Sequence, residues 1–210
     1  MPPITKIVLS DKELSLITNS EWILTKQSVI QKVYELLAGS SQYIEAAIMD
    51  KFFLPAEITA TTPKIYKGEN YRQLPYVLLD YPRYFQQEET FAIRTMFWWA
   101  NFFSITLLVS GKYKQMINPE ALDKSIAWQE GLFICVHEDQ WQHHFETDNY
   151  LPYHHLTKQQ QQELLYNKTF IKLSVKYTLD QWNELPELLA DGYLKMASLL
   201  INCPGGEKVP

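Results

Sequence analysis

The segment that decides the fold class is TFIKLSVKYT, residues 169–178, in which apolar and polar side chains alternate with a period of two. One row consists of Ile171, Leu173, Val175 and Tyr177, and the other of Lys172, Ser174 and Lys176. Alternation of this kind is typical of a β-strand that buries one face and leaves the other in water. The segment therefore predicts a half-buried strand in a sheet that helices cover on one side.

Three further segments are rich in aromatic and β-branched residues, which favour strands. These segments are residues 71–80, 91–109 and 132–137, and the long middle one is expected to fold back or bulge on itself. Together with residues 169–178 they predict a mainly antiparallel sheet of about five strands.

Helical signals precede these strands. Ser10 and Glu13 have the spacing of a capping box, in which each side chain accepts the other residue's backbone N–H, so a short helix should cover residues 11–18. Apolar residues recur at intervals of three and four over residues 21–38, which predicts a second helix that ends at Gly39. Residues 42–51 are expected to continue as a third helical piece.

Three more helices are expected further along the chain. Asn118 and Pro119 open one that runs through Trp128, and Thr157 with Gln160 repeats the capping-box spacing ahead of a polar helix through Tyr166. Residues 179–200 have helical spacing, with Pro186 as a kink or a fresh start. The sequence thus predicts a single α+β domain over residues 1–201, with N-terminal helices and a C-terminal amphipathic helix packed on the sheet, and a flexible tail at 202–210.

Composition narrows the classes of function. The chain has 210 residues and a net charge of -5, with its lysines and arginines dispersed, which argues against a surface that follows nucleic-acid phosphates. Its two cysteines form no framework, so a reduced, cytoplasmic setting is expected. Residues 1–11 contain only a short apolar stretch, and the longest apolar run, residues 97–109, is too short and too interrupted for a membrane span.

The segment between Tyr66 and Tyr113 is unusual in two ways. It holds 13 of the 29 aromatic residues, and it holds all three arginines, which are Arg72, Arg83 and Arg94. The planar guanidinium can bind a carboxylate or phosphate through two parallel hydrogen bonds. The segment therefore predicts a site for a small acidic ligand; the residues expected to bind it are Arg72, Arg94, Tyr76, Trp98 and Asp80.

A plainer interpretation of the same segment stands beside this one. Aromatic residues favour strands and pack under helices without any ligand. The arginines can equally form internal ion pairs with Asp80, Glu88 or Glu89. On this interpretation the segment is structural.

All five histidines lie within nineteen residues, between His137 and His155. Histidine is the commonest metal ligand, and a hairpin near residues 138–140 would bring His137, His143 and Glu146 together. This grouping predicts a metal site, and with it a metal-dependent enzyme as an alternative function. The spacing matches no His-x-His or His-Glu-x-x-His motif, so exposed histidines without a metal are the competing interpretation.

Cys135 and His137 share a strand face, but two residues along a strand span about 6–7 Å, too far for a thiol and its base to form a hydrogen bond. A buried, inert thiol is the simpler expectation. The nucleophile-elbow, P-loop and dinucleotide motifs are absent from the sequence, so no particular cofactor is implied. A third class of function, a homo-oligomeric subunit whose aromatic residues pack against a second copy, stays open.

Overall fold

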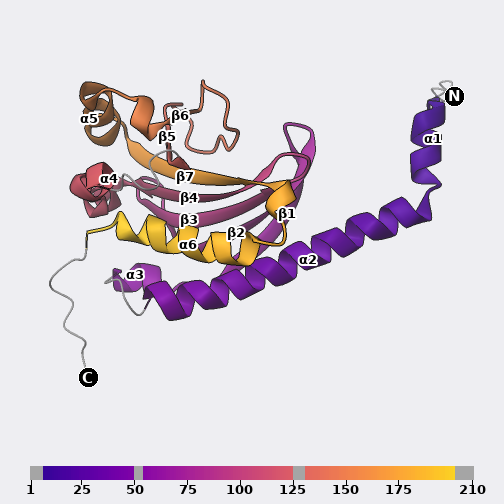
Figure 1. Cartoon of the computed structure of the whole chain (residues 1–210), viewed down its shortest axis with the longest axis horizontal. Coiled ribbons are helices and arrows are strands. Elements are labelled where there is room, and N and C mark those ends of the chain that lie inside the picture. Colours follow the sequence, from indigo (N-terminus) through magenta and orange to yellow (C-terminus); the bar gives the residue numbers. More distant parts are fainter. Residues whose placement is uncertain (1–6, 50–53, 125–130, 202–210) are drawn as a thin grey trace, which may run out of the picture.

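The computed structural model describes residues 7–49, 54–124 and 131–201. Its centre is a seven-stranded antiparallel sheet with the strand order β1-β2-β3-β4-β7-β5-β6 (Figure 1). The strands are β1 (Lys64–Tyr71), β2 (Leu74–Phe85), β3 (Thr90–Trp98), β4 (Phe102–Ser110), β5 (Phe133–Cys135), β6 (Tyr150–Pro152) and β7 (Phe170–Thr178). The α+β class is confirmed, whereas the expected number of about five strands is wrong because β1 and the three-residue β6 carry little sequence signal.

The α-helices are α1 (Asp11–Ile17), α2 (Ser20–Ile44), α3 (Ala56–Thr59), α4 (Pro119–Lys124), α5 (Lys158–Tyr166) and α6 (Leu185–Ser198). Short helical turns are η1 (Glu45–Met49), η2 (Gly111–Met116), η4 (Tyr153–His155) and η5 (Leu179–Gln181). Both expected capping boxes are present, at Ser10 and at Thr157. Among the helices of the described ranges, none is both long and apolar enough to cross a membrane.

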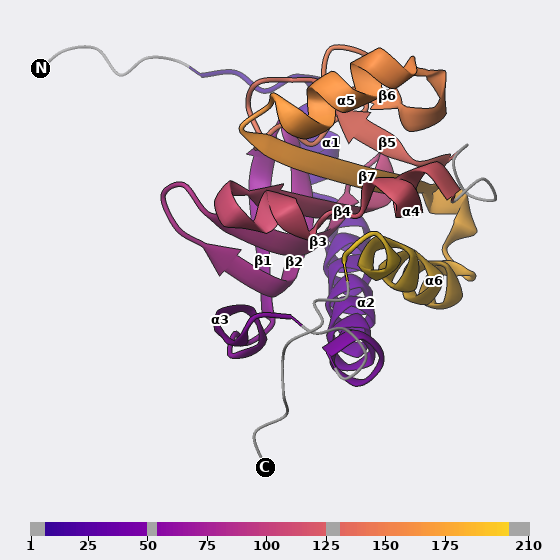
Figure 2. The same cartoon turned by 90° about the vertical axis from the view of Figure 1, so that its left-hand side faces the viewer.

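One face of the sheet is covered by helices. Figures 1 and 2 show α2 and α6 side by side on this face. The main hydrophobic core fills the space between them and the strands; its fully buried members include Val33, Leu37, Val77, Leu79, Phe103, Ile105, Leu173, Leu189 and Tyr193. Burial of this size is the chief stabilising contribution to the fold.

The end of one helix and the burial of one strand differ from those expected. Helix α2 runs straight through Gly39 to Ile44, because Ser40, Ser41 and Ile44 continue its buried face and this packing outweighs the cost of about 1 kcal/mol for a glycine in a helix. Strand β7 is buried on both faces at Lys172 and Ser174, whereas the alternation predicts that these two side chains point into water.

The face of the sheet opposite the helices is covered by a loop of the protein rather than by solvent. The segment of residues 136–149, which we call the cover loop, lies over it. Lys172 donates hydrogen bonds from Nζ to the backbone oxygens of Gln140 and Gln142, and the Tyr71 hydroxyl accepts from the amides of His143 and His144. The sheet is therefore the middle layer of three.

The expected fold-back of residues 91–109 is confirmed as the hairpin of β3 and β4. Pro186 stands in the first turn of α6, so it marks a fresh helix start rather than a kink. The helix expected over residues 118–128 is seen as α4, and residues 125–128 lie outside the described part of the chain. The expected tail at 202–210 and the end of the helical piece at 50–51 lie outside it as well.

Candidate functional site

A polar layer crosses the loop-covered face of the sheet. Asp80 on β2 stands opposite Arg94 on β3, and Arg94 stands opposite Thr106 on β4. The register continues from Thr106 to Ser174 on β7. Because cross-strand partners on one face lie close together, four neighbouring strands place their polar side chains in a row.

The charges in this row are paired. Asp80 accepts from Arg94 Nε at 2.6 Å and from Arg94 Nη2 at 2.9 Å, and both side chains are buried. The Tyr66 hydroxyl donates to Asp80 at 3.1 Å and accepts from Arg94 Nη2 at 3.2 Å. Burial raises the pKa of Tyr66 to about 12, so this phenol stays protonated and holds the pair. The plainer expectation of an internal ion pair is thus confirmed for Arg94 and Asp80.

A β-bulge on β2 adds a second arginine to the same face. The register shifts between Asp80, opposite Arg94, and Arg83, opposite Ala92. In a regular strand, residues three apart point to opposite faces, but the extra residue of the bulge returns Arg83 to the face of Asp80. Arg83 Nε is buried and has no hydrogen-bond partner in the structure.

These groups line a cavity of about 310 Å³ at the open end of the polar layer, which we call the Arg94 pocket. Its lining residues are Lys64, Tyr66, Tyr76, Leu78, Asp80, Arg83, Phe85, Arg94, Trp141 and His143. The volume falls in the range of small-molecule sites, roughly 300–1,000 Å³. Four of the ten lining residues are Phe, Tyr or Trp, and three cationic side chains face one carboxylate that is already paired.

The cover loop contributes the outer wall of the Arg94 pocket. The Trp141 ring lies 5.4 Å from the Arg94 guanidinium carbon, and His143 Nε2 lies 3.4 Å from Arg94 Nη1. Burial, together with the nearby charges of Lys172 and Arg94, holds the pKa of His143 well below its usual value. At neutral pH this imidazole is therefore uncharged and can accept a hydrogen bond from Arg94 Nη1.

Three of the five ligand residues expected from sequence line this one cavity, namely Arg94, Tyr76 and Asp80. Arg72 lies elsewhere, in the turn between β1 and β2, and forms a two-pronged ion pair with Glu146. Trp98 packs between Tyr71 and Phe102, in the apolar cluster next to the pocket, but it does not line the cavity. The expected set is therefore only partly brought together.

The expected metal ligands His137, His143 and Glu146 are not brought together. His137 Nδ1 accepts from the amide of Asp139 at 2.9 Å, while His143 faces Arg94 and Glu146 is held by Arg72. Each side chain thus has a separate partner, and the turn near residues 138–140 does not make them converge.

A different trio could hold a cation. His144 Nδ1 lies 3.7 Å from Glu146 Oε2 and 3.8 Å from Asp148 Oδ1, the one such grouping within the described ranges. A nitrogen and two carboxylates suit Zn²⁺ or Mn²⁺. However, the Arg72 guanidinium occupies both oxygens of Glu146 and brings a positive charge close to His144, which opposes binding of a dication. We therefore assign no metal to this trio.

Cys135 is not paired with an imidazole. Its thiol donates to Asn149 Oδ1 at 3.3 Å, and burial raises its pKa. A thiol with a raised pKa is a poor nucleophile at neutral pH. The expectation of an inert thiol fits this environment.

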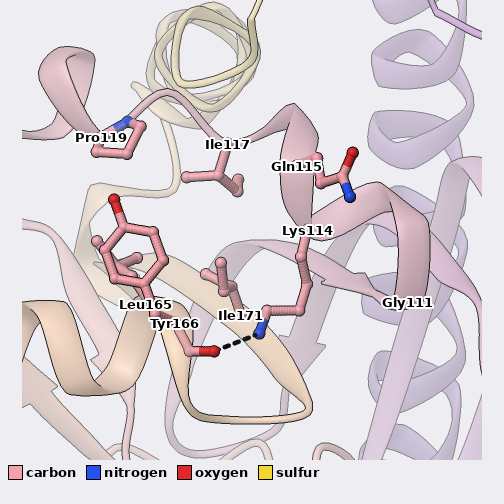
Figure 3. A pocket seen from close by; sticks show the side chains of 8 residues that line it. All are labelled: Gly111, Lys114, Gln115, Ile117, Pro119, Leu165, Tyr166 and Ile171. Carbon is pink, nitrogen blue, oxygen red and sulfur yellow. Dashed lines mark hydrogen bonds between the residues drawn. The ribbon is translucent and has the colours of Figure 1, made fainter.

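Two other cavities are less suited to an anion. Figure 3 shows one of about 380 Å³ beside η2 and α5, whose charged group, Lys114, donates to the backbone oxygens of Tyr166 and Lys168. The rest of its lining is mainly apolar and offers few polar groups. A groove of about 720 Å³ beyond Trp141 is lined by four acidic residues, which are Glu88, Glu89, Glu138 and Asp139. The Arg94 pocket is therefore the best candidate for a ligand of negative charge.

Lys64, Arg83 and Trp141 are pocket residues that sequence reasoning does not assign to the site. Arg83 stands out in the sequence as one of three arginines, but only the bulge decides which face it occupies. Trp141 comes from a loop some fifty residues away from the strands that it covers. Comparison of the chain with models of known protein families, with curated proteins and with solved structures finds no match.

Proposed function

We propose that this chain binds a small organic anion, with a carboxylate or phosphate group on a planar or apolar body, in the Arg94 pocket. The observation that carries the proposal is the excess of cationic groups in a cavity walled by aromatic rings. Lys64, Arg83 and Arg94 face a single carboxylate, Asp80. An anion would balance this excess of positive charge.

The free donors indicate where the anion would bind. Asp80 occupies Nε and Nη2 of Arg94, which leaves Nη1 with only the 3.4 Å contact to His143. Arg83 Nε is buried without a partner, and an unsatisfied buried donor costs roughly 1–3 kcal/mol. An anion in the pocket that accepts from the guanidinium groups of Arg83 and Arg94 would pair with both charges.

The walls favour a ligand with a flat apolar body. Tyr76, Phe85 and Trp141 present rings to the cavity, and Tyr76 lies opposite Gly68 on β1. A Cβ on Gly68 would stand 2.4 Å from the Tyr76 ring, so this glycine leaves the room that the ring occupies. Planar ligands gain both apolar burial and stacking against such walls.

The test compares two charge-removing variants in binding experiments with benzoate, phenyl phosphate and inorganic phosphate as probes. Arg83→Gln removes a charged donor from the pocket, and we expect it to weaken binding of an aromatic anion by about tenfold or more. Lys195→Gln is the control: it removes a positive charge from α6, on the helix-covered side of the sheet, and should leave the affinity unchanged. Isothermal titration calorimetry measures both, and Trp141 fluorescence gives an independent signal.

Equal affinity of the Arg83→Gln variant and the unmodified protein would contradict the proposal, as would the failure of every probe to bind. Arg94 is not used for the test, because its removal leaves Asp80 buried without a countercharge. A loss of that kind costs about 3–5 kcal/mol of stability whether or not a ligand binds.

A further inference from the structure

The N-terminal arm, residues 7–28, extends away from the body of the molecule. Figure 1 shows α1 and the first half of α2 reaching beyond the sheet. Every residue from 7 to 25 is exposed, and α1 buries none of its side chains. A helix of seven residues is too short to be stable in water without packing against something.

This arm is also unusually apolar for an exposed segment. The described part of the chain has twelve large hydrophobic residues that are exposed, and nine of them lie in the arm. They are Ile7, Val8, Leu9, Leu14, Leu16, Ile17, Trp22, Ile23 and Leu24. None of the twelve lies among the aromatic residues between Tyr66 and Tyr113, so these aromatics offer no comparable surface.

The buried stripe of α2 continues onto the arm. Ile44 and Leu37 are fully buried, and one heptad earlier Ile30 is half-buried. A further heptad earlier, Ile23 is 42 % exposed. A seven-residue spacing keeps side chains on one face of a helix, so the face that packs on the sheet continues along the arm, where it is exposed in the described part of the chain. That pattern indicates a partner for the exposed half.

We propose that this partner is a second copy of the chain, and that the two arms pack against each other as antiparallel helices about a two-fold axis near Ile23 and Leu24. The nine residues are 41–87 % exposed, which leaves much of their surface available to an interface, and a stable interface buries ~800 Å² on each partner. A two-fold axis makes the same patch serve both copies.

The charges of the arm favour a second copy of the chain as its partner, rather than a membrane surface. The arm has three acidic residues and two basic ones, and therefore lacks the lysine-rich polar face that binds anionic lipids. In the antiparallel arrangement, Glu21 of each copy lies at the level of Lys26 of the other. The ion pair of Lys26 with Glu69, at 3.5 Å, is at the surface, so Lys26 can exchange partners.

The first test is the mass of the full chain in solution over a range of concentrations, by light scattering and sedimentation velocity. We expect a dimer that the double variants Ile23→Glu/Leu24→Glu and Leu14→Glu/Ile17→Glu convert to a monomer. These side chains are exposed, so the circular dichroism of the body should not change. Tyr166→Glu is the matched control, because among the described residues outside the arm Tyr166 is the most exposed large hydrophobic one.

Charge exchange tests the orientation. Glu21→Lys and Lys26→Glu should each weaken the dimer several-fold, and the double variant should restore it. A chain that is monomeric at all concentrations would overturn the proposal, and so would a dimer that survives both double variants. Binding of a monomeric chain to phosphatidylcholine vesicles, lost in the Ile23→Glu/Leu24→Glu variant, would assign the arm to membranes instead. Failure of the charge exchange to restore the dimer would overturn the antiparallel arrangement.

Discussion

Lys172 is the most unusual single residue on the loop-covered face of the sheet, because it is a fully buried amine. Its exposed fraction is 2 %, and its Nζ lies 5.2 Å from the centre of the Tyr150 ring. Burial is the main reason that its pKa is lowered to about 8. The charges of Arg94, which lowers the pKa further, and of Asp139, which raises it, act on the same amine.

The lowered pKa predicts how stability depends on pH. Between about pH 8 and pH 10, the unfolded chain holds a proton on this amine that the folded chain has lost, so the free energy of unfolding increases as pH rises. The expected slope is up to about 1.4 kcal/mol per pH unit. Denaturant titrations between about pH 8 and pH 9 measure it, since the raised pKa of Cys135 gives an opposite slope at higher pH.

Lys172→Met is the control for this slope. Methionine fills a similar volume without a titrating group, so the variant should lose the increase that the unmodified protein shows. Its absolute stability is not the readout, because the variant also leaves two loop carbonyls without a donor. Parallel pH curves for the two proteins would refute the assignment of the slope to Lys172.

The burial of Lys172 could not be predicted from the sequence. Lys172 and Ser174 alternate with apolar neighbours, and alternation alone predicts an outward, solvated row. Lys172 is buried because the cover loop crosses that face and accepts hydrogen bonds from its amine. Nothing within residues 169–178 indicates that this loop is present. By contrast, the pairing of Arg94 with Asp80 could be anticipated, since both residues lie on long apolar strands that exclude an unpaired charge.

At the scale of elements, we expect substitution of glycine by alanine to have opposite effects on stability at two positions, one in α6 and one in α2. A Cβ on Gly192 of α6 would lie 2.4 Å from the Tyr177 hydroxyl oxygen and 2.6 Å from Ile105 Cδ1, so this glycine permits close packing of α6 on the sheet. Gly192→Ala should therefore lower the free energy of unfolding, by roughly 1–3 kcal/mol of overpacking. Gly39 of α2 has no atom within 4 Å of the equivalent position.

Gly39→Ala should therefore raise the free energy of unfolding by about 0.5–1 kcal/mol, through the higher helix propensity of alanine. Chemical denaturation of both variants beside the unmodified protein measures the contrast. A stabilised Gly192→Ala variant would mean that α6 can move away from β4 and β7 at little cost, which is contrary to the packing described.

Elements with strong periodicity could be predicted, and elements defined by tertiary contacts could not. Helices α1, α5 and α6 follow from caps and spacing, and the β3–β4 hairpin follows from its long aromatic run. The β1–β2 hairpin is hidden in the sequence because Arg72 and Gln73 form its turn with positive φ angles of 49° and 69°, where Asn-Gly is the usual signal. Strand β6 is hidden because its three residues are too few to show any period.

At the scale of the whole molecule, the two faces of the sheet are supported very differently. The helix-covered face belongs to one core of 32 buried apolar residues, whereas the loop-covered face has two clusters of four each. The Arg94 pocket lies on the weaker side, where β2, β3 and the cover loop meet. The α+β class was predictable because most strands and helices carry their own pattern, but a pocket assembled from distant segments depends on topology.

This asymmetry predicts a separate opening of the cover loop. The amides of Val136, His143 and His144 in this loop donate hydrogen bonds. However, the loop makes fewer buried apolar contacts than β3 and β4 do. In hydrogen exchange followed by mass spectrometry, peptides from residues 136–149 should exchange at least about tenfold faster than those from residues 90–110. Equal protection of the two sets would mean that the molecule opens only as one unit, and the Arg94 pocket would then be rigid. The faster exchange of the loop is expected because opening it uncovers the polar layer, which water can solvate, while the helix-side core stays closed.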